Sequence, residues 1–326
     1  MNISQNFVKG LIRDSYGYML ESYDALEEVW PQIYAEKQID GDFWQETILL
    51  NSNGYRKTAE AEGYQHQAVK EGWTIYGRVY TYTKATAFSK NTIEDVKKIG
   101  SLIKKISGDW GIDAKECREE FYARPFNQGG MTAGDWIFNG NPESMAITAS
   151  PVDLPYDSVA FFNLSDNLRT SKGGGTYYNS HALTLTDDNL MTIISHGESA
   201  NNRRENDSQM NLNFDTLLLP ATKRFKAKQI LNSTLAPYLS TNTTNAMQGE
   251  LNPIKWQYLT NLEAFFVGKV EKNPSRAGIV ALKRQEPTID IFQDKPNRCW
   301  WAASEMRIGF MMRDWRFWNA SNATTA

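Results

Sequence analysis

The run from Trp73 to Lys84, WTIYGRVYTYTK, constrains the fold more than any other stretch of the sequence. β-branched and aromatic residues dominate it, which is typical of a β-strand. Because side chains alternate between the two faces of a strand, both faces here carry large apolar groups. One face is predicted to hold Trp73, Ile75 and Val79, and the other Tyr76, Tyr80 and Tyr82.

Residues 51–89 are predicted to form one long hairpin, of which this run is the returning strand. Upstream, Asn51-Ser52-Asn53-Gly54 has the composition of a turn. Each half spans roughly 15 residues, or about 50 Å, which is longer than the strands of most compact domains. Since an isolated two-stranded ribbon is marginally stable in water, the hairpin is interpreted as lying over neighbouring protein. The alternative is two ordinary strands of a wider sheet.

Two helices are predicted C-terminal to the hairpin. Residues 91–107 have apolar side chains at helical spacing and a capping-box pair at their start. Gly108 is expected to end this helix, and a second helix is expected to stop before Pro125. The first fifty residues are expected to be an arm with one helix, interrupted at Pro31.

The rest of the sequence mixes short strands with helices. Residues 159–162 are predicted as a short buried strand, and Thr186 to about Ser199 as a helix. Asp215 to Leu219 is predicted as a strand that leads through Pro220 into another helix. This order of elements predicts an α+β fold. Long apolar strands are predicted over 258–270, 277–292 and 298–318.

No catalytic or metal-binding motif stands out in the sequence. Its three histidines have no cysteine at zinc-ligand spacing, and there is no GxSxG or phosphate-loop motif. The glycine-rich segment 171–176 is followed by poor helix-forming residues and is predicted as a flexible loop. His181 after it is interpreted as a packing or surface residue rather than a general base. No enzyme activity, cofactor or metal is therefore expected.

Composition disfavours several other classes of protein. A net charge of −3 disfavours wrapping of nucleic acid by the whole surface. Two cysteines cannot build a disulfide framework, so a reducing compartment is expected. No run of uncharged apolar residues is long enough for a membrane-spanning helix, and the N-terminus lacks the pattern of a secretory signal.

The order of these elements, together with four stretches of sequence, resembles the major capsid proteins of tailed bacteriophages, which have the Hong Kong 97-type fold. The stretch AVKEGWTIYGRVYTYTKATAFSKNTIEDVKKI resembles the returning half of that family's extended loop and its long spine helix. The stretches LPYDSVAFFN and GGGTYYNSHALTLTDDNLMTIISH are similar to a segment of Mu-like head proteins. DTLLLPATKRFKAKQILNST resembles a unit of the axial domain. The strands AFFVGKV, RQEPTIDIF and WWAASEMRIGFMMRDWRFWNAS resemble the sheet of the peripheral domain.

This resemblance implies a Hong Kong 97-type capsid fold of the α+β class with four parts. They are an N-terminal arm (1–50), an extended β-hairpin loop (51–89), a peripheral domain with the spine helix (90–185 and 285–326) and an axial domain (186–284). The arm and the extended loop would then contact adjacent subunits. The candidate contact residues are Trp30, Tyr55, Trp73, Tyr76, Arg78 and Tyr80.

The resemblance also implies a structural protein that self-assembles through hexamers and pentamers into an icosahedral head. The head would enclose the double-stranded DNA genome of a tailed phage without sequence-specific contacts and without a membrane. The protein would occur in the virion, and in the host cytoplasm during assembly. Because the expected arm begins near Met1, a separate scaffolding protein is expected. A portal and a decoration protein are further candidate partners, and no covalent cross-link is predicted.

Two alternatives remain open at this point. An encapsulin-type nanocompartment shares the fold but encloses a cargo enzyme, so DNA inside purified particles would separate the two. A carbohydrate-binding or hydrolytic protein would use the aromatic surface and His181. Such a protein would be a soluble monomer that binds a glycan or cleaves a model ester.

Overall fold

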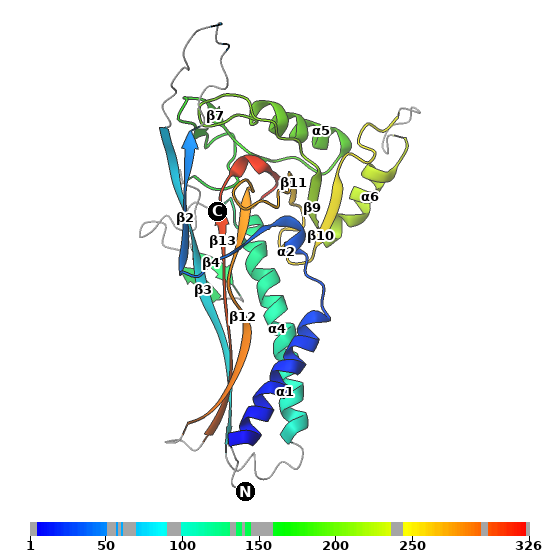
Figure 1. The fold of residues 1–326 in the computed structure, drawn as a ribbon. Helices are drawn as coiled ribbons and strands as arrows, with labels where there is room; N and C mark the ends of the chain where they lie inside the picture. Colours follow the sequence, from blue (N-terminus) through cyan, green and yellow to red (C-terminus); the bar gives the residue numbers. More distant parts are fainter. Residues whose placement is uncertain are drawn as a thin grey trace.

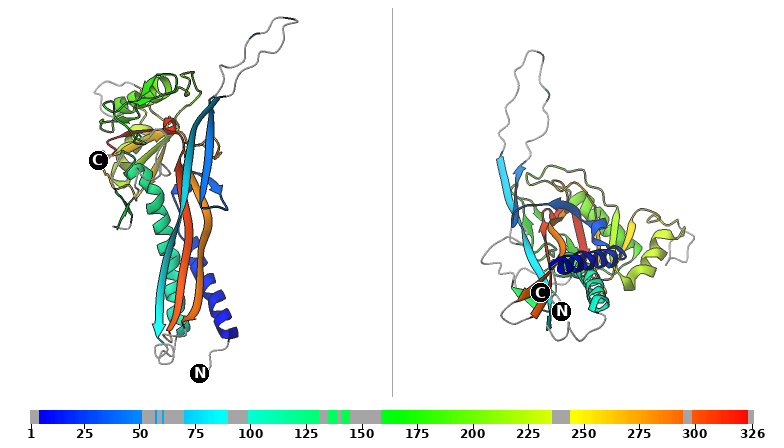
Figure 2. Two further views of the ribbon diagram at one scale, coloured as in Figure 1. Left: turned by 90° about the vertical axis from the view of Figure 1, so that its left-hand side faces the viewer. Right: turned by 60° about the horizontal axis from the view of Figure 1, so that its bottom comes forward.

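The computed structural model of the chain describes residues 5–50, 57, 60, 70–89, 99–130, 135–138, 141–144, 159–235, 244–294 and 299–323. They form an elongated molecule with two five-stranded sheets (Figure 1). The first sheet has long strands and is called here the long sheet, and the second is the short sheet. Figure 2 shows the short sheet and its helices at one end of the long sheet.

The long sheet has the strand order β1-β12-β13-β3-β2. β1 runs parallel to β12, whereas all the other neighbours are antiparallel. The central pair, β12 and β13, is joined from Ile279↔Met312 to Asp294↔Cys299, with a bulged region after Lys283. The strands are β1 (Ala35–Gln38), β2 (Phe43–Leu50), β3 (Lys70–Ser89), β12 (Ile279–Asp294) and β13 (Cys299–Met312).

The strand predicted over Trp73–Lys84 is confirmed as part of β3, but it does not stand in a lone ribbon. β3 lies between β2 and β13, and the register along β13 runs from Ser89↔Cys299 to Arg78↔Phe310. The alternative of a wider sheet is therefore the correct one for residues 70–89. A single strand pair leaves backbone groups open on both sides, and β13 satisfies one of those sides. Most of residues 51–69 lie outside the described part.

The two predicted faces of this strand are confirmed by its packing. Ile75 and Val79 pack in a small apolar cluster with residues of β1, β12 and β13. Tyr80 and Tyr82 pack against the main core on the other face. Apolar groups on both faces are therefore covered by the chain's own strands and helices.

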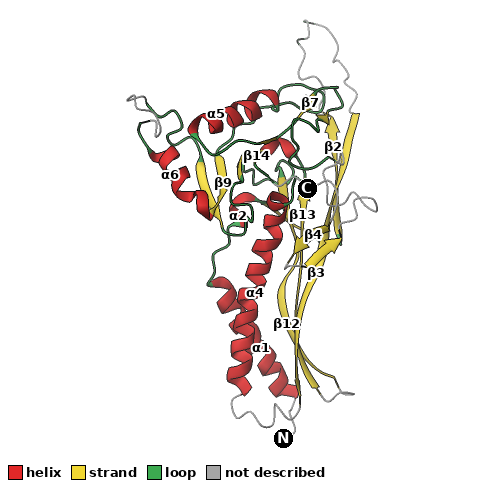
Figure 3. Cartoon of the chain, turned by 180° about the vertical axis from the view of Figure 1, so that it is seen from behind, coloured by secondary structure: helices red, strands yellow, loops and turns green. Residues whose placement is uncertain are grey.

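Two helices, α1 (Gln5–Asp24) and α4 (Ile99–Asn127), run along one face of the long sheet (Figure 3). Met19 of α1 and Trp110 of α4 share an apolar cluster with Ile289 and Ala302 of the sheet. Near its C-terminal end, α4 buries Phe121 and Phe126 in the main core. Burial of one face of each helix against the sheet stabilises both elements.

The prediction that Gly108 ends one helix and that another stops before Pro125 is wrong. α4 is continuous across both residues. Gly108 lies where α1 packs, and a Cβ atom there would be 3.0 Å from Ser22 Oγ. Gly108 therefore lies at the contact between the two helices and does not end α4. Pro125 lies two residues before the helix end, where the buried residues around it fix the backbone.

The N-terminal region also differs from its prediction. A regular helix, α1, precedes Asp24, and the helix expected around Pro31 is a single turn, α2 (Trp30–Ile33). Pro31 lies in the first turn of α2, where its missing N–H costs no hydrogen bond. The chain then turns into β1, so the apolar spacing of this segment reflects burial rather than a long helix.

The short sheet has the strand order β10-β9-β11-β14-β8. The predicted helix over 186–199 is confirmed as α5 (Asp187–Ser195) followed by the π-helical turn η1 (His196–Ala200). The predicted strand–Pro–helix unit is confirmed as β9, the short turn η2 (Ala221–Lys223) and α6 (Arg224–Asn232), although Pro220 ends the strand. The strands are β8 (Ser180–His181), β9 (Thr216–Pro220), β10 (Asn252–Trp256), β11 (Phe265–Gly268) and β14 (Trp318–Ser321).

Smaller elements complete the fold. Two short hairpins pair β4 (Asp135–Phe138) with β5 (Asn141–Ser144), and β6 (Arg169–Thr170) with β7 (Thr176–Tyr177). The last turn, η3 (Trp315–Phe317), joins β13 to β14. The strand predicted over 159–162 is wrong, because Ala160, Phe161 and Phe162 are buried in a bend without a strand partner. No helix in the described ranges is long and apolar enough to cross a membrane.

Candidate assembly surface

Trp30 lies in the core of this chain. Its side chain is fully buried, and its ring lies 4.4 Å from that of Tyr122 of α4. Its backbone N–H donates to Glu119 Oε1 at 3.3 Å, and Val29 N–H and Trp256 Nε1 donate to the same carboxylate. Trp30 is therefore a core residue. A tryptophan on an apolar stripe suits a core as well as an interface, so the sequence pattern alone does not distinguish the two.

Trp73 is held by its own chain. Its indole Nε1 donates to Glu205 Oε2 at 3.4 Å, and Lys172 Nζ lies 4.5 Å above the ring. Lys172 Nζ also donates to the Gly72 carbonyl at 3.1 Å. These contacts attach the start of β3 to the turn between β6 and β7. A role of the half-buried Trp73 in contacts with another subunit remains a prediction.

The other candidates on β3 differ in accessibility. Arg78 is exposed, whereas Tyr76 and Tyr80 are half-buried. Arg78 lies opposite Phe43 of β2, and its guanidinium is 5.8 Å from the Tyr80 ring. Their contact with a neighbouring subunit remains a prediction, and Tyr55 lies outside the described residues.

The most exposed large apolar side chain in the described part is Phe225, near the start of α6, at 76% exposure. The buried face of α6 consists of Ala227, Ile230 and Leu231, which have the helical i, i+3, i+4 spacing. Phe225 lies two residues before this stripe, about 200° around the helix from Ala227. The helical spacing of the apolar residues therefore predicts the exposure of Phe225, although Phe225 is not among the candidate contact residues named from the sequence.

Phe225 belongs to a larger protrusion, which we call the α6 knob and define as residues 222–225 together with 262–263. Leu262 is 53% exposed, and its carbonyl accepts from Thr222 Oγ1 at 3.1 Å. Lys223 Nζ forms an ion pair with Glu263 at 2.5 Å, which fixes the two segments together. The knob thus presents two large apolar side chains on an ordered base.

The electrostatics of α6 also favour a partner. Its first turn has no acidic residue, and it begins with the exposed Arg224. The positive end of the helix dipole disfavours cations at this position. Anionic groups of another surface would relieve that cost.

β2 offers a second surface. It ends the long sheet, and within the described residues it pairs with β3 alone. Phe43 at its start is 58% exposed. An open strand edge with an exposed aromatic residue is a site at which another chain readily adds.

The histidine pair and the glycine-rich turn have structural roles. The ring of His181 lies 5.0 Å from that of His196 and 5.4 Å from that of Tyr178. Burial, with a smaller effect of His196, lowers the pKa of His181 to about 4, so the imidazole is neutral and packed. This confirms the packing interpretation of His181.

The segment predicted as a flexible loop, 171–176, is an ordered turn. Asp207 accepts hydrogen bonds from Ser171 Oγ at 2.6 Å, Gly175 N–H at 3.1 Å and Tyr177 Oη at 2.7 Å. Burial works against its charge, yet these bonds hold the pKa of Asp207 below its usual value. The carboxylate thus stabilises the turn between β6 and β7. Among the described residues there is no group of three potential metal ligands.

No family model matches the sequence, and no curated protein matches it significantly. Solved structures do match. The mature capsid of bacteriophage PhiM1 gives a TM-score of 0.52 at 8% identity, over 92% of this chain and 88% of the other. The chain has the Hong Kong 97-type capsid fold. Other matches with this fold are the capsid of a native GTA particle (TM-score 0.51, 8% identity, 91% and 90% coverage) and a virus-like particle from Pyrococcus furiosus (TM-score 0.50, 9% identity, 95% and 99% coverage).

These structural matches confirm the Hong Kong 97-type fold that the sequence resemblance predicted. At 8–9% identity the likeness concerns backbone arrangement rather than shared side chains. The match to the GTA capsid covers about nine tenths of both chains. The functional surfaces therefore have to be found from this chain's own residues.

Proposed function

We propose that this protein is the subunit of a closed protein shell, the icosahedral head of a tailed phage, built from hexamers and pentamers of the chain. The proposal rests on the capsid fold over nine tenths of the chain. It is supported by the α6 knob, because its two large exposed apolar side chains, Phe225 and Leu262, belong to one protrusion rather than being scattered singly. Shell formation supplies partners for such a protrusion in copies of the same chain.

The function we propose is structural, without catalysis. The contents would be double-stranded DNA, and the partners a separate scaffolding protein, a portal and a decoration protein. The location would be the virion, with assembly in the host cytoplasm. A nanocompartment with a cargo enzyme is the competing function, since capsids and a virus-like particle share this backbone.

We also propose that the long-sheet part corresponds to the peripheral domain and the short-sheet part to the axial domain. The boundaries need adjustment from 186–284 and 285–326. β14 (Trp318–Ser321) pairs with β11 in the short sheet, and β12 begins at Ile279 in the long sheet. The axial part would then run to about residue 278 and include the last strand.

The experiment that tests this function is electron microscopy of the purified protein with assay of the particle contents. We expect closed shells, and nuclease-protected DNA in shells from a complete infection. A protein cargo and no DNA would favour the nanocompartment. A monomer at every concentration would contradict shell formation of either kind.

A matched pair of variants on α6 tests the knob. Phe225→Ser should abolish or strongly reduce shells and change the unfolding free energy by less than about 0.5 kcal/mol, because the side chain is exposed. Ala227→Ser on the same helix faces the core and should instead lower thermal stability. Shells of Phe225→Ser at normal yield would exclude the knob from the assembly surface.

A further inference from the structure

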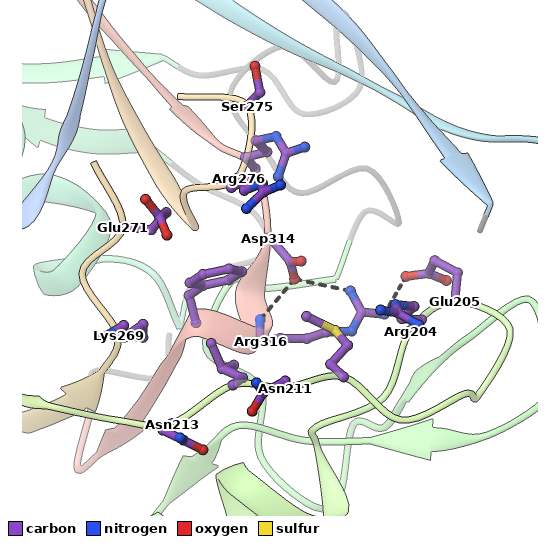
Figure 4. A pocket seen from close by; sticks show the side chains of 14 residues that line it. Arg204, Glu205, Asn211, Asn213, Lys269, Glu271, Ser275, Arg276, Asp314 and Arg316 are labelled. Carbon is purple, nitrogen blue, oxygen red and sulfur yellow. Dashed lines mark hydrogen bonds and ion pairs between the residues drawn. The ribbon is translucent and has the colours of Figure 1, made fainter. Parts of the chain in front are cut away.

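A cavity of about 550 Å³ opens where the chain crosses between the two sheets (Figure 4). Its walls come from three segments, which are residues 204–213, the β11–β12 connection (269–276) and the β13–β14 connection (313–317). Cationic side chains outnumber anionic ones on its lining. The cations are Arg204, Lys269, Arg276, Arg313 and Arg316, and the anions are Glu205, Glu271 and Asp314.

Three of the five cations have partners in the chain. Arg316 is almost fully buried and binds Glu205 at 2.5 Å and Asp314 at 3.0 Å. Arg313 pairs with Glu46 at 3.0 Å, and Lys269 pairs with Asp215. These groups build the walls of the cavity and have little capacity left for a ligand.

The other two cations are available. Arg204 and Arg276 are exposed, and in the described part of the chain neither guanidinium forms an ion pair or a hydrogen bond. The side chains of Asn211, Asn213 and Ser275 are likewise without hydrogen bonds among the described residues. The cavity therefore holds two planar donors for anions together with several neutral polar groups.

We propose that this cavity binds an acidic peptide segment of another polypeptide, with two separated carboxylates directed at Arg204 and Arg276. Figure 4 shows these two side chains on different sides of Asp314. A single compact anion between them would meet the Asp314 carboxylate. Two carboxylates on one chain reach both guanidiniums and avoid that repulsion.

The neutral groups fit the same ligand. The amides of Asn211 and Asn213 can donate to and accept from a peptide backbone that crosses the cavity. A cavity of several hundred cubic ångströms accommodates a few residues of such a segment. This proposal does not depend on shell formation, because the cavity belongs to one chain.

Fluorescence anisotropy of labelled hexaglutamate, with labelled hexaglutamine as the uncharged probe, tests the proposal on the full chain. We expect hexaglutamate to bind and hexaglutamine not to bind. Arg204→Ala and Arg276→Ala should each weaken binding roughly tenfold, since each removes one charge-assisted contact. Lys228→Ala removes an exposed cation on α6, away from the cavity, and should leave binding unchanged.

Three results would overturn the proposal. The first is equal binding of the two probes, and the second is an equal loss of binding in Lys228→Ala. The third is displacement of hexaglutamate by inorganic phosphate as effectively as by free glutamate oligomers, which would indicate a site for any small oxyanion. Melting curves of the variants show whether the fold is intact, and because both arginines are exposed no change is expected.

Discussion

At the scale of single residues, His181 shows how burial sets a pH dependence. Its Nε2 is buried and has no hydrogen-bond partner among the described residues. Burial and the neighbouring His196 lower its pKa to about 4, whereas an unfolded chain has a histidine pKa near 6.5. As the pH falls from about 6.5 to about 4, the unfolded state binds a proton at His181 that the folded state does not bind. Stability therefore falls across this window.

The variant His181→Phe should reduce this dependence, because it removes one proton that only the unfolded state binds, whereas His196, whose pKa burial also lowers, remains. Urea unfolding between pH 4 and pH 7 measures the slope. Tyr178→Phe keeps both imidazoles and the ring stacking, so its slope should equal that of the unaltered protein. Equal slopes in all three proteins would mean that His181 titrates normally in the fold.

At this scale the sequence predicts the role of His181 but not that of Trp30. It predicted His181 as a packing residue from the absence of any nucleophile motif. It did not predict the burial of Trp30 in the chain's own core, because a tryptophan on an apolar face packs equally well in a core or an interface. The deciding contact is the Glu119 carboxylate, which accepts from Trp30 and from the distant Trp256, and no local pattern encodes such a pairing.

At the scale of elements, the glycines of α4 explain why a helix end was wrongly predicted at Gly108. Glycine in a helical pattern usually lowers the probability of helix, yet α4 continues through Gly108 and Gly111 because α1 packs closely there. Tertiary contact outweighs local propensity at these positions. The length of β3, in contrast, was predictable from its own alternating residues, whereas its second neighbour β13 was not, since that pairing joins distant parts of the chain.

The two glycines should respond oppositely to alanine. A Cβ at position 111 would lie 2.4 Å from the Met19 carbonyl oxygen, so Gly111→Ala has to displace the α1 backbone and should cost about 1–3 kcal/mol. At position 108 the nearest atom is the movable Ser22 Oγ at 3.0 Å, so Gly108→Ala should be neutral or stabilise by up to about 1 kcal/mol. Urea unfolding of both variants measures the difference. Equal effects would refute close helix packing as the reason for Gly111.

At the scale of the whole molecule, two sheets are joined by one continuous core. The Phe126 ring of α4 lies 5.1 Å from both Phe266 and Trp318 of the short sheet, and the Phe121 ring of α4 lies 5.3 Å from Phe310 of the long sheet. The long helix therefore packs on both sheets. The resemblance implied a peripheral and an axial domain, besides an arm and an extended loop, but not this shared core. Pairing of β14 with β11 places the C-terminal strand in the short sheet, and no residue spacing in the sequence predicts this long-range pairing.

The ion pairs of Arg316 with Glu205 and Asp314 should add to the free energy of unfolding. They should not decide whether the two sheets unfold together. Arg316→Met leaves the buried Glu205 and the half-buried Asp314 without their cation, which should cost about 3–5 kcal/mol. Arg307→Met breaks a more exposed pair with Glu305 and should cost less than about 1 kcal/mol. Calorimetry of Arg316→Met should give one transition at a lower temperature, because Phe121 and Phe126 of α4 still couple the two sheets. Two separate transitions would mean that the arginine, and not the aromatic core, holds the two halves together.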